Sequence, residues 1–390
     1  MRIGVEERRA RLARRHRLAP SARSDDPVEI AGDLVGLHAT DPASVYLGTA
    51  ARMRKPALEP VQDALYETRT LVRMLGMRRT MFVLPVDLAA IVQAACAGTV
   101  AARERRKLEQ MIDGAGLHDD AAGHVREVEE ATLRALAARG EATGVELSND
   151  VPALRQEFPF GLGTKWDGVQ RLTTRLLGLL GAEGRIVRGR PRGSWLSSQY
   201  RWTTMESWLP GGLEAWETEA AQAELARRWL NSFGPATVTD LRWWTGWTAG
   251  ETKRALASLE TVEVELDGEP GLVLADDLEP VATPEPWVGL LPGLDPTVMG
   301  WKRREWYLGP HGPALFDTAG NAGPSVWCDG RIVGGWGQPP SGAVAFRLLE
   351  DVGAEARAAV EAEAERLGAW LDGVRVAPRF RTPLELELSV

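Results

Sequence analysis

A short pattern that occurs twice limits how this chain can fold: Ala-Thr-x-x-x-Leu stands at residues 142–147 and again at 236–241. Each copy follows a segment with helical periodicity. Thr143 and Thr237 are placed to cap a short helix, and the leucine of each pattern then faces inward one turn further on. A repeat at about 94 residues is too long for a short-period solenoid. It predicts tandem copies of one larger module.

The sequence after the second copy indicates what that module is. Gly246 suits a turn, and Thr248 and Glu251 have the spacing of a capping box at the start of another helix. Two predicted strands follow at 262–266 and 271–275, and an Asp-Gly pair suits the tip between them. Helices around a tight turn, followed by a two-stranded ribbon, are the outline of a winged helix.

Similar outlines precede this unit. Near the N-terminus, 71–84 contains two short strands joined near Gly76; in the middle of the chain, 169–180 is the expected helix and 184–193 a basic strand and loop. After residue 280 the pattern changes to short strands, Gly/Pro turns and a closing helix at 354–371. We therefore predict an α+β chain with three tandem winged-helix units and a β-rich C-terminal domain. The predicted domains are 1–25 (a basic helix or arm), 26–117, 118–210 and 211–280 (the three winged helices) and 281–390 (the β-rich domain).

Three polar residues of the first unit, His38, Thr40 and Asp41, stand together between apolar segments. Apolar spacing over 28–37 predicts a helix, while Asp41 suits the N-cap and Pro42 the first turn of a second helix. We therefore expect His38 and Thr40 where a helix ends. Two interpretations stay open: a packed histidine beside an ordinary helix cap, or a functional site.

Composition and missing motifs exclude several classes of site. The five histidines form no ligand cluster, which argues against a metal, and neither a Gly-x-Gly-x-x-Gly motif nor a P-loop supports a nucleotide cofactor. No apolar run reaches the 18 or so residues that a membrane span needs, and the N-terminus lacks a secretory signal. We expect a cytoplasmic chain with Cys96 and Cys328 as free thiols, although their pairing stays open.

Basic residues gather in three places, although the net charge of -8 argues mildly against a nucleic-acid partner. A ribbon of arginines suits phosphate contacts, but a solvated surface loop is an equally good interpretation. The candidate DNA-binding residues are Arg185, Arg188, Arg190 and Arg192 on the ribbon of the second unit, Lys253 and Arg254 on a helix of the third unit, and Lys302, Arg303 and Arg304 beside Trp306.

Segments in nearly every part of the chain resemble one family. They are Gly36-Leu-His-Ala-Thr-Asp-Pro42, Arg79-Thr-Met-Phe-Val83, Gly234-Pro-Ala-Thr-Val-Thr-Asp-Leu241, Leu291-Pro-Gly-Leu-Asp-Pro296 and the β segment 316–335. On these residues the chain resembles the AlkZ-type winged-helix DNA glycosylases, also classed as the helix-turn-helix 42 family. That family includes azinomycin self-resistance and crosslink-unhooking enzymes. The resemblance implies three winged helices in a C shape with a C-terminal β-barrel, holding duplex DNA without metal or cofactor.

The chain departs from the family in one motif. Family members have Gln-hydrophobic-Gln or Gln-hydrophobic-Asp, whose side chains are thought to position the hydrolytic water; His38 and Thr40 stand at these positions here, around Ala39. His38 could orient or deprotonate the water, Thr40 could hold it, and Asp41 could supply a carboxylate. We expect a monomeric, nucleoid-associated repair glycosylase that hydrolyses the N-glycosidic bond of alkylated or bulky purines. The alternatives are a catalytically silent DNA-binding regulator or lesion sensor, and a scaffold for a protein or small ligand.

Overall fold

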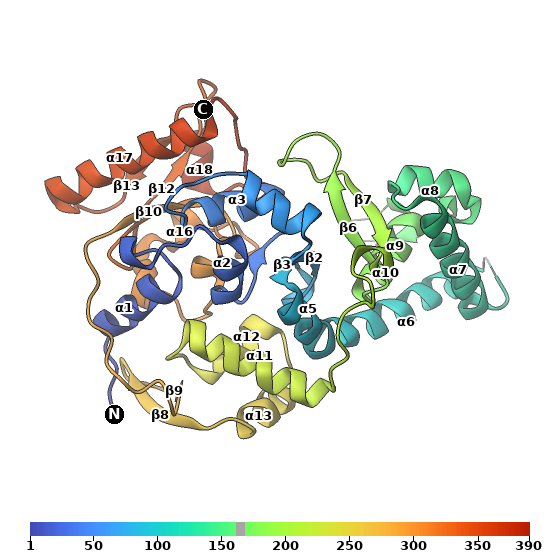
Figure 1. Ribbon diagram of the computed structural model, residues 1–390, viewed down its shortest axis with the longest axis horizontal. Helices are drawn as coiled ribbons and strands as arrows, with labels where there is room; N and C mark the ends of the chain where they lie inside the picture. The colour runs from blue at the N-terminus through green and yellow to red at the C-terminus, as the bar shows by residue number, and fades with distance from the viewer. Residues whose placement is uncertain (117, 161–167) are drawn as a thin grey trace.

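In the computed structural model, which describes residues 1–116, 118–160 and 168–390, a similar order of elements occurs three times: a helix, a short extended segment, two helices and a two-stranded ribbon. In the second copy a further pair of short strands, 157–160 and 168–171, stands between the two helices. Figure 1 shows the three copies in succession along the chain. The first consists of α2 (Pro27–Asp33), β1 (Leu37–His38), α3 (Pro42–Ala50), α4 (Glu59–Gln62) with η2 (Asp63–Glu67), β2 (Leu71–Leu75) and β3 (Met81–Pro85).

The second copy follows the first through a long helix, and the third follows the second through the loop 209–217. In each copy the extended segment pairs with the second strand of the ribbon: strand β1 with β3 in the first, and through single bridges Ala142 with Trp202 and Ala236 with Leu272 in the others. The elements are α7 (Ala121–Arg139), α8 (Gly144–Asp150), α9 (Leu172–Ala182), β6 (Ile186–Pro191) and β7 (Tyr200–Thr204), then α11 (Thr218–Phe233), α12 (Val238–Thr245), α13 (Ala249–Ala257), β8 (Thr261–Leu266) and β9 (Glu269–Leu274). The repeated Ala-Thr pattern therefore marks the same junction in both copies.

The three predicted helix caps are confirmed. The hydroxyls of Thr143, Thr237 and Thr248 each accept the N–H of the residue three positions on, and the acidic residue there bonds back to the threonine N–H. Leu147 and Leu241, one turn after the caps, are buried, as the pattern predicted. Reciprocal caps satisfy two otherwise unpaired donors at each helix start, which is why these boundaries could be found from sequence.

Two predicted helix boundaries are wrong. The helix expected over 28–37 ends at Asp33, because Val35 and Gly36 adopt φ values of 49° and 106° that no helix accommodates. A side chain at Gly36 would meet Leu84 at 2.5 Å, so glycine lets the chain approach β3 and pair as a strand. The helix expected from residue 169 begins at Leu172 instead, since 168–171 form strand β5.

A continuous helix over Val86–Gly114 connects the first and second units and consists of α5 (Val86–Val92), η4 (Gln93–Ala97) and α6 (Gly98–Gly114). It contains an 18-residue window with a mean hydropathy of 1.3, half of which is buried, so by length and composition it could cross a membrane. The sequence expectation that no such run exists is therefore wrong. Helix α11 packs against α5 and η4, as a helix in a protein core would.

The C-terminal part forms an open four-stranded antiparallel sheet in the order β10-β11-β12-β13. The barrel expected for this part is not formed by the described residues, because β10 and β13 lie at opposite edges and do not pair; helix α17 packs on β10 and α18 on β12. The strands are β10 (Val288–Leu291), β11 (Ser325–Cys328), β12 (Arg331–Gly337) and β13 (Ala345–Leu348), and the longer helices are α17 (Gly353–Leu371) and α18 (Pro383–Leu388). Shorter elements are β4 (Glu157–Phe160), β5 (Gly168–Arg171), α10 (Met205–Trp208), α14 (Pro296–Met299), α15 (Glu305–Leu308) and α16 (Gly312–Leu315).

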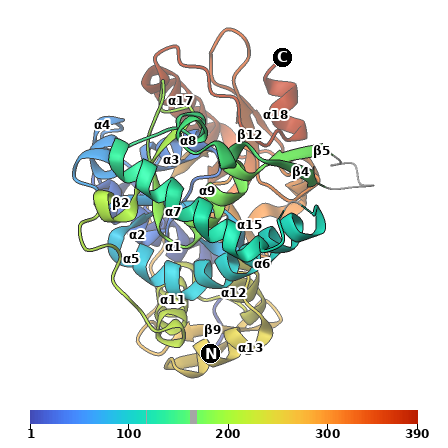
Figure 2. The same ribbon diagram turned by 90° about the vertical axis from the view of Figure 1, so that its right-hand side faces the viewer.

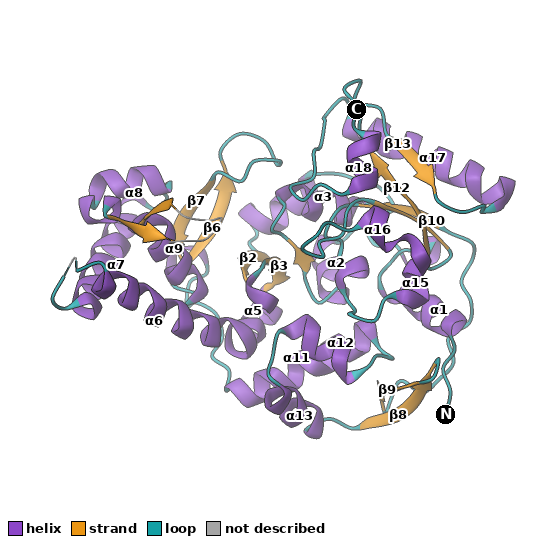
Figure 3. Ribbon diagram, turned by 180° about the vertical axis from the view of Figure 1, so that it is seen from behind, coloured by secondary structure: helices purple, strands orange, loops and turns teal. Residues whose placement is uncertain are grey.

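The arrangement places the β2–β3 ribbon between the second unit and the C-terminal part (Figure 3). The third unit lies at the opposite end of the molecule from α17 and α18 (Figure 2). The basic N-terminal helix α1 (Val5–Arg15) connects the third unit to the C-terminal part: Arg11 and Arg15 form ion pairs of 2.8 and 2.6 Å with Asp277, and Arg8 stacks on Trp306 at 4.2 Å. These arginines hold the fold together and are not free for phosphates.

One fully buried ion pair joins the first unit to the C-terminal part. Arg52 meets both carboxylate oxygens of Asp295, at 2.9 and 2.7 Å, and both side chains are 0% exposed. The guanidinium also donates to the carbonyls of His16 and Gly48 and to the Thr297 hydroxyl. Every donor is thus satisfied, which is the condition under which a buried pair is tolerated.

We expect Asp295→Ala to lower the free energy of unfolding by about 3–5 kcal/mol, because it leaves the Arg52 charge buried and unpaired. Urea denaturation measures the change. The double replacement Arg52→Met with Asp295→Leu should cost less than the single one, since it leaves no charge behind. Glu130→Ala is the control, because the 3.6 Å pair of Glu130 with Arg134 is largely exposed. An equal small loss in Asp295→Ala and Glu130→Ala would contradict the expectation.

Candidate functional site

Strand β1 determines where the polar residues of the first unit point. His38 lies opposite Phe82 of β3, with ring centroids 5.1 Å apart. The Ala39 N–H donates to the Met81 carbonyl at 2.7 Å, and the Thr40 hydroxyl accepts the Met81 N–H at 3.4 Å. Strand β1 ends at His38, and the bonds from Ala39 and Thr40 to Met81 keep the next two residues beside β3.

The environment of His38 restricts its chemistry. The side chain is 4% exposed, and its Nδ1 atom has no hydrogen-bond partner within the described chain. Burial, and then the nearby charge of Arg78, lowers the pKa of His38 to about 3. At neutral pH the imidazole is therefore uncharged. It can orient a water through a hydrogen bond, but a group of this pKa is a poor general base.

Asp41 joins the motif to the C-terminal segment. One carboxylate oxygen accepts the N–H of Ala43 at 3.2 Å, which caps α3 as predicted, and the other accepts the N–H of Arg379 at 2.9 Å. The Arg379 guanidinium in turn donates to the Thr40 carbonyl at 3.4 Å. Both oxygens of Asp41 thus have backbone partners, which fits a positioning role better than a catalytic one.

A cluster of tyrosines and arginines lies near the Asp41 side of the motif. Arg73 donates to the Ala39 carbonyl at 3.3 Å and stacks on Tyr200 at 4.9 Å. Burial, opposed by the Arg73 charge, raises the pKa of Tyr46 and of Tyr200, and the neighbouring Tyr66 raises both further. The hydroxyls of these three tyrosines are buried, and the Tyr46 hydroxyl lies close to that of Tyr66.

A cationic groove of about 870 Å³ adjoins this cluster. It is lined by residues of α8, α9, β6 and β7 and by Arg379, and it contains Arg188 and Arg192 from the predicted set. Arg188 stacks on Tyr200 at 5.6 Å and on Trp202 at 5.1 Å. Among the described residues, no carboxylate lies within 4.0 Å of the Arg188, Arg192 or Arg379 guanidinium. Because Arg379 contacts Thr40, the groove reaches the motif.

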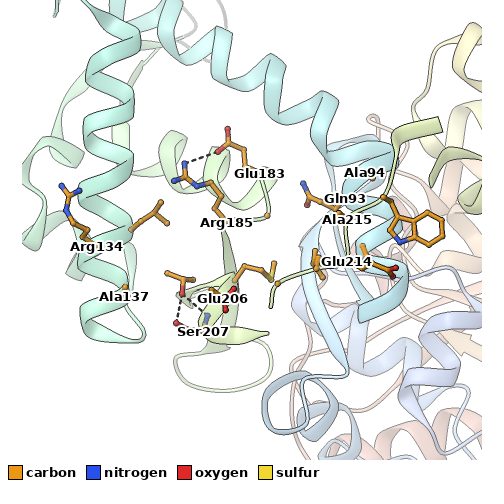
Figure 4. Close-up of a pocket in the computed structure, with 18 residues that line it drawn as sticks. Gln93, Ala94, Arg134, Ala137, Glu183, Arg185, Glu206, Ser207, Glu214 and Ala215 are labelled. Carbon is orange, nitrogen blue, oxygen red and sulfur yellow. Dashed lines mark hydrogen bonds and ion pairs between the residues drawn. The ribbon is translucent and has the colours of Figure 1, made fainter. Parts of the chain in front are cut away.

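The other two ribbon arginines have acidic partners. Arg190 forms a 2.6 Å ion pair with Glu67. Arg185 does not line the groove: it lies 3.5 and 3.8 Å from Glu129 and Glu183 and lines a second cavity of about 870 Å³ (Figure 4). The structure therefore brings only two of the four predicted ribbon arginines to the motif groove.

The remaining predicted cations lie on or beside the third unit. Lys253 and Arg254 are exposed on α13, where Arg254 is 3.6 Å from Glu219. The backbone N–H groups of Lys302 and Arg303 donate to Asp240, so their side chains project from the contact between α12 and the C-terminal part. Arg304 stacks on Trp243, which is only partly buried, at 5.1 Å.

Sequence reasoning missed Arg73, Arg379 and the tyrosines. One signal was available, because Arg73 interrupts an otherwise apolar strand. The three tyrosines stand far apart in the sequence, so only the fold brings them together. No local signal marks Arg379, because its contact with Asp41 spans 338 residues of sequence.

Comparisons with known proteins agree with this architecture. The family model for AlkZ-like DNA glycosylases matches residues 31–370, so the chain belongs to that family. The solved structure of Streptomyces sahachiroi DNA glycosylase AlkZ superposes with a TM-score of 0.74 at 22% identity and covers 97% of this chain and 100% of that one. An interstrand DNA cross-link repair glycosylase from the same organism is 30% identical over 129 residues, which are 31% of this chain and 35% of the relative. That match thus spans about a third of the relative's length.

The pKa of His38 gives a direct test of the site. Because the folded-state pKa lies below the ordinary value of 6.5, the unfolded chain takes up the proton first. His38 therefore stabilises the fold above about pH 6.5, and that contribution falls toward pH 3 by at most about 1.4 kcal/mol per pH unit. We expect the His38 ring resonance, assigned by its absence in His38→Asn, to stay constant between pH 5 and 8. A midpoint near 6.5 would contradict this environment.

Proposed function

We propose that this chain is a monofunctional DNA glycosylase that hydrolyses the N-glycosidic bond of alkylated or bulky purines, crosslinked bases included, in duplex DNA. The observation that carries the proposal is the position of His38 and Thr40. His38 ends β1 and Thr40 follows two residues later, at the family's water-positioning motif, in a segment that adjoins a groove with three arginines that have no acidic partner among the described residues. The fold, by contrast, would support many functions.

The reaction needs little from the protein beyond positioning and charge. An N7- or N3-alkylated purine already carries positive charge, so it leaves readily as the sugar becomes oxocarbenium-like. Neutral His38 and the Thr40 hydroxyl would hold the attacking water, with Asp41 keeping the motif in place. No lysine occupies the motif, so we assign hydrolysis and not lyase chemistry through a Schiff base.

We infer that the three repeated units are winged helices, with the domain limits given by the sequence. In support, each unit has helices followed by a two-stranded ribbon, and in each a short extended segment pairs with the second strand of that ribbon. Arg188, Arg192 and Arg379 would contact phosphates in the groove, and Lys302 and Arg303 would extend the contact past the third unit. Such contacts make duplex binding strongly dependent on salt. We propose a monomer acting in the cytoplasm, without a membrane partner.

A catalytically silent DNA-binding protein is the second candidate. The observation that favours it is the departure from the family motif: His38 replaces glutamine and is too weak a base to activate water by deprotonation. A silent relative would bind DNA through the same groove and release no base. A regulator among such proteins would be expected as a symmetric dimer with half-site spacing.

Incubation with duplex DNA carrying N7-methylguanine or a bulkier N7 adduct, scored as alkali-labile abasic sites, tests the proposal. We expect His38→Ala and Thr40→Ala each to reduce single-turnover base release by about 10²–10³-fold, the usual cost of losing one preorganised polar group at a reacting centre. Arg134→Gln, an exposed change far from the motif, should leave the rate unchanged. Tight binding with no release from any adduct would favour the silent protein instead.

A further inference from the structure

A pair of arginines shares one tryptophan on the His38 side of the motif. The Arg78 guanidinium lies 4.0 Å from the Trp243 ring centroid, and the Arg304 guanidinium lies 5.1 Å from the same ring and 4.7 Å from Phe316. Arg78 comes from the β2–β3 ribbon, Trp243 from α12 and Arg304 from the start of α15. Three separate parts of the chain therefore build the arrangement.

The charge of this pair is not compensated. No described carboxylate lies within 4.0 Å of either guanidinium, and Arg304 donates only to the Trp301 carbonyl. The Nε of Arg78 is buried without a hydrogen-bond partner in the described chain. Burial, and then the Arg304 charge, lowers the pKa of Arg78 to about 10. Two close cations with free donors are costly unless an anion joins them.

The backbone holds Arg78 in this position. Arg78 and Arg79 adopt φ values of 52° and 61°, a left-handed conformation that is unfavourable for arginine and often occurs at ligand sites. Gly246 at the end of α12 has a φ of 78°, and a side chain there would lie 3.4–3.5 Å from Arg78. The third unit thus fixes the tip of the first unit's ribbon.

The location relates the pair to the motif. Arg78 lies in the turn that leads into β3, and His38 pairs with Phe82 of that strand. Arg78 is also near enough to His38 to lower the pKa of its imidazole, and Thr40 follows His38 by two residues. An anion between Arg78 and Arg304 would therefore lie next to the sugar whose glycosidic bond is broken. Planar guanidinium groups are suited to bind the paired oxygens of a phosphate.

We propose that Arg78 and Arg304 bind one phosphodiester of the damaged strand next to the lesion. Trp243 would keep the two guanidinium groups in place by stacking against both. The inference rests on the proposed function, since it names the ligand group that the same site takes. Arg78 is the positioning residue here: it places the strand so that the lesion's anomeric carbon meets the water held by His38 and Thr40.

Neutral backbone substitution tests the contact without requiring base release. Duplexes with an uncleavable abasic analogue and a single methylphosphonate, moved one position at a time, are bound by the wild type, Arg78→Gln, Arg78→Lys and Arg304→Gln. We expect one methylphosphonate position to weaken wild-type binding about tenfold and to have no further effect in Arg78→Gln or Arg304→Gln. Arg78→Lys should keep part of the sensitivity, because lysine still binds phosphate as a point charge.

The salt dependence gives a second measure. Each glutamine variant should reduce the slope of log affinity against log salt by about 1, whereas Arg134→Gln should leave it unchanged. Thermal midpoints equal to that of the wild type show that the variants are folded. Additive losses at every methylphosphonate position would overturn the phosphate site even if bases are released. Coupling at one position without base release would retain the phosphate site and contradict the glycosylase proposal.

Discussion

The buried ion pair between Arg52 and Asp295 is the contact on which the position of the motif depends. Arg52 follows α3, the helix that Asp41 caps, and Asp295 caps α14 in the C-terminal part. Ser44 adds a hydrogen bond to the Gly293 carbonyl, and Gly48 leaves room for the Asp295 carboxylate, which a side chain there would approach to 3.3 Å. The segment 291–296 therefore holds in place the helix that begins directly after the motif.

Buried or partly buried aspartates link different parts of the chain at two other places as well. One carboxylate oxygen of Asp41, Asp240 and Asp295 accepts a backbone N–H at the start of a short helix. The other oxygen of each accepts a hydrogen bond from a distant part of the chain. Asp41 accepts the Arg379 N–H, and Asp240 accepts the N–H groups of Lys302 and Arg303. Three of the segments that resemble the AlkZ family thus connect one unit of the chain to another. The motif, the groove and the Arg78–Arg304 pair all lie where different units meet.

Local chemistry explains what the sequence could predict. The caps at Thr143, Thr237 and Thr248 depend on residues three positions apart, so the repeat and its helix starts were recoverable. The strand at Leu37–His38 was not, because its apolar spacing also fits a helix and only the pairing with β3 decides. Likewise, no local pattern predicts that the C-terminal sheet stays open, or that Arg379 and Arg304 approach the first unit.

The pH dependence of base release tests the central claim most directly, namely that a neutral His38 orients the water. Single-turnover release from an N7-methylguanine duplex would be followed between about pH 5.5 and 8 for the wild type and His38→Gln, the variant that restores the glutamine of the family motif. The account predicts a flat profile for both, with His38→Gln retaining activity that His38→Ala loses. A wild-type rate that rises through a midpoint near 6.5 and becomes flat in His38→Gln would show a titrating base and contradict it.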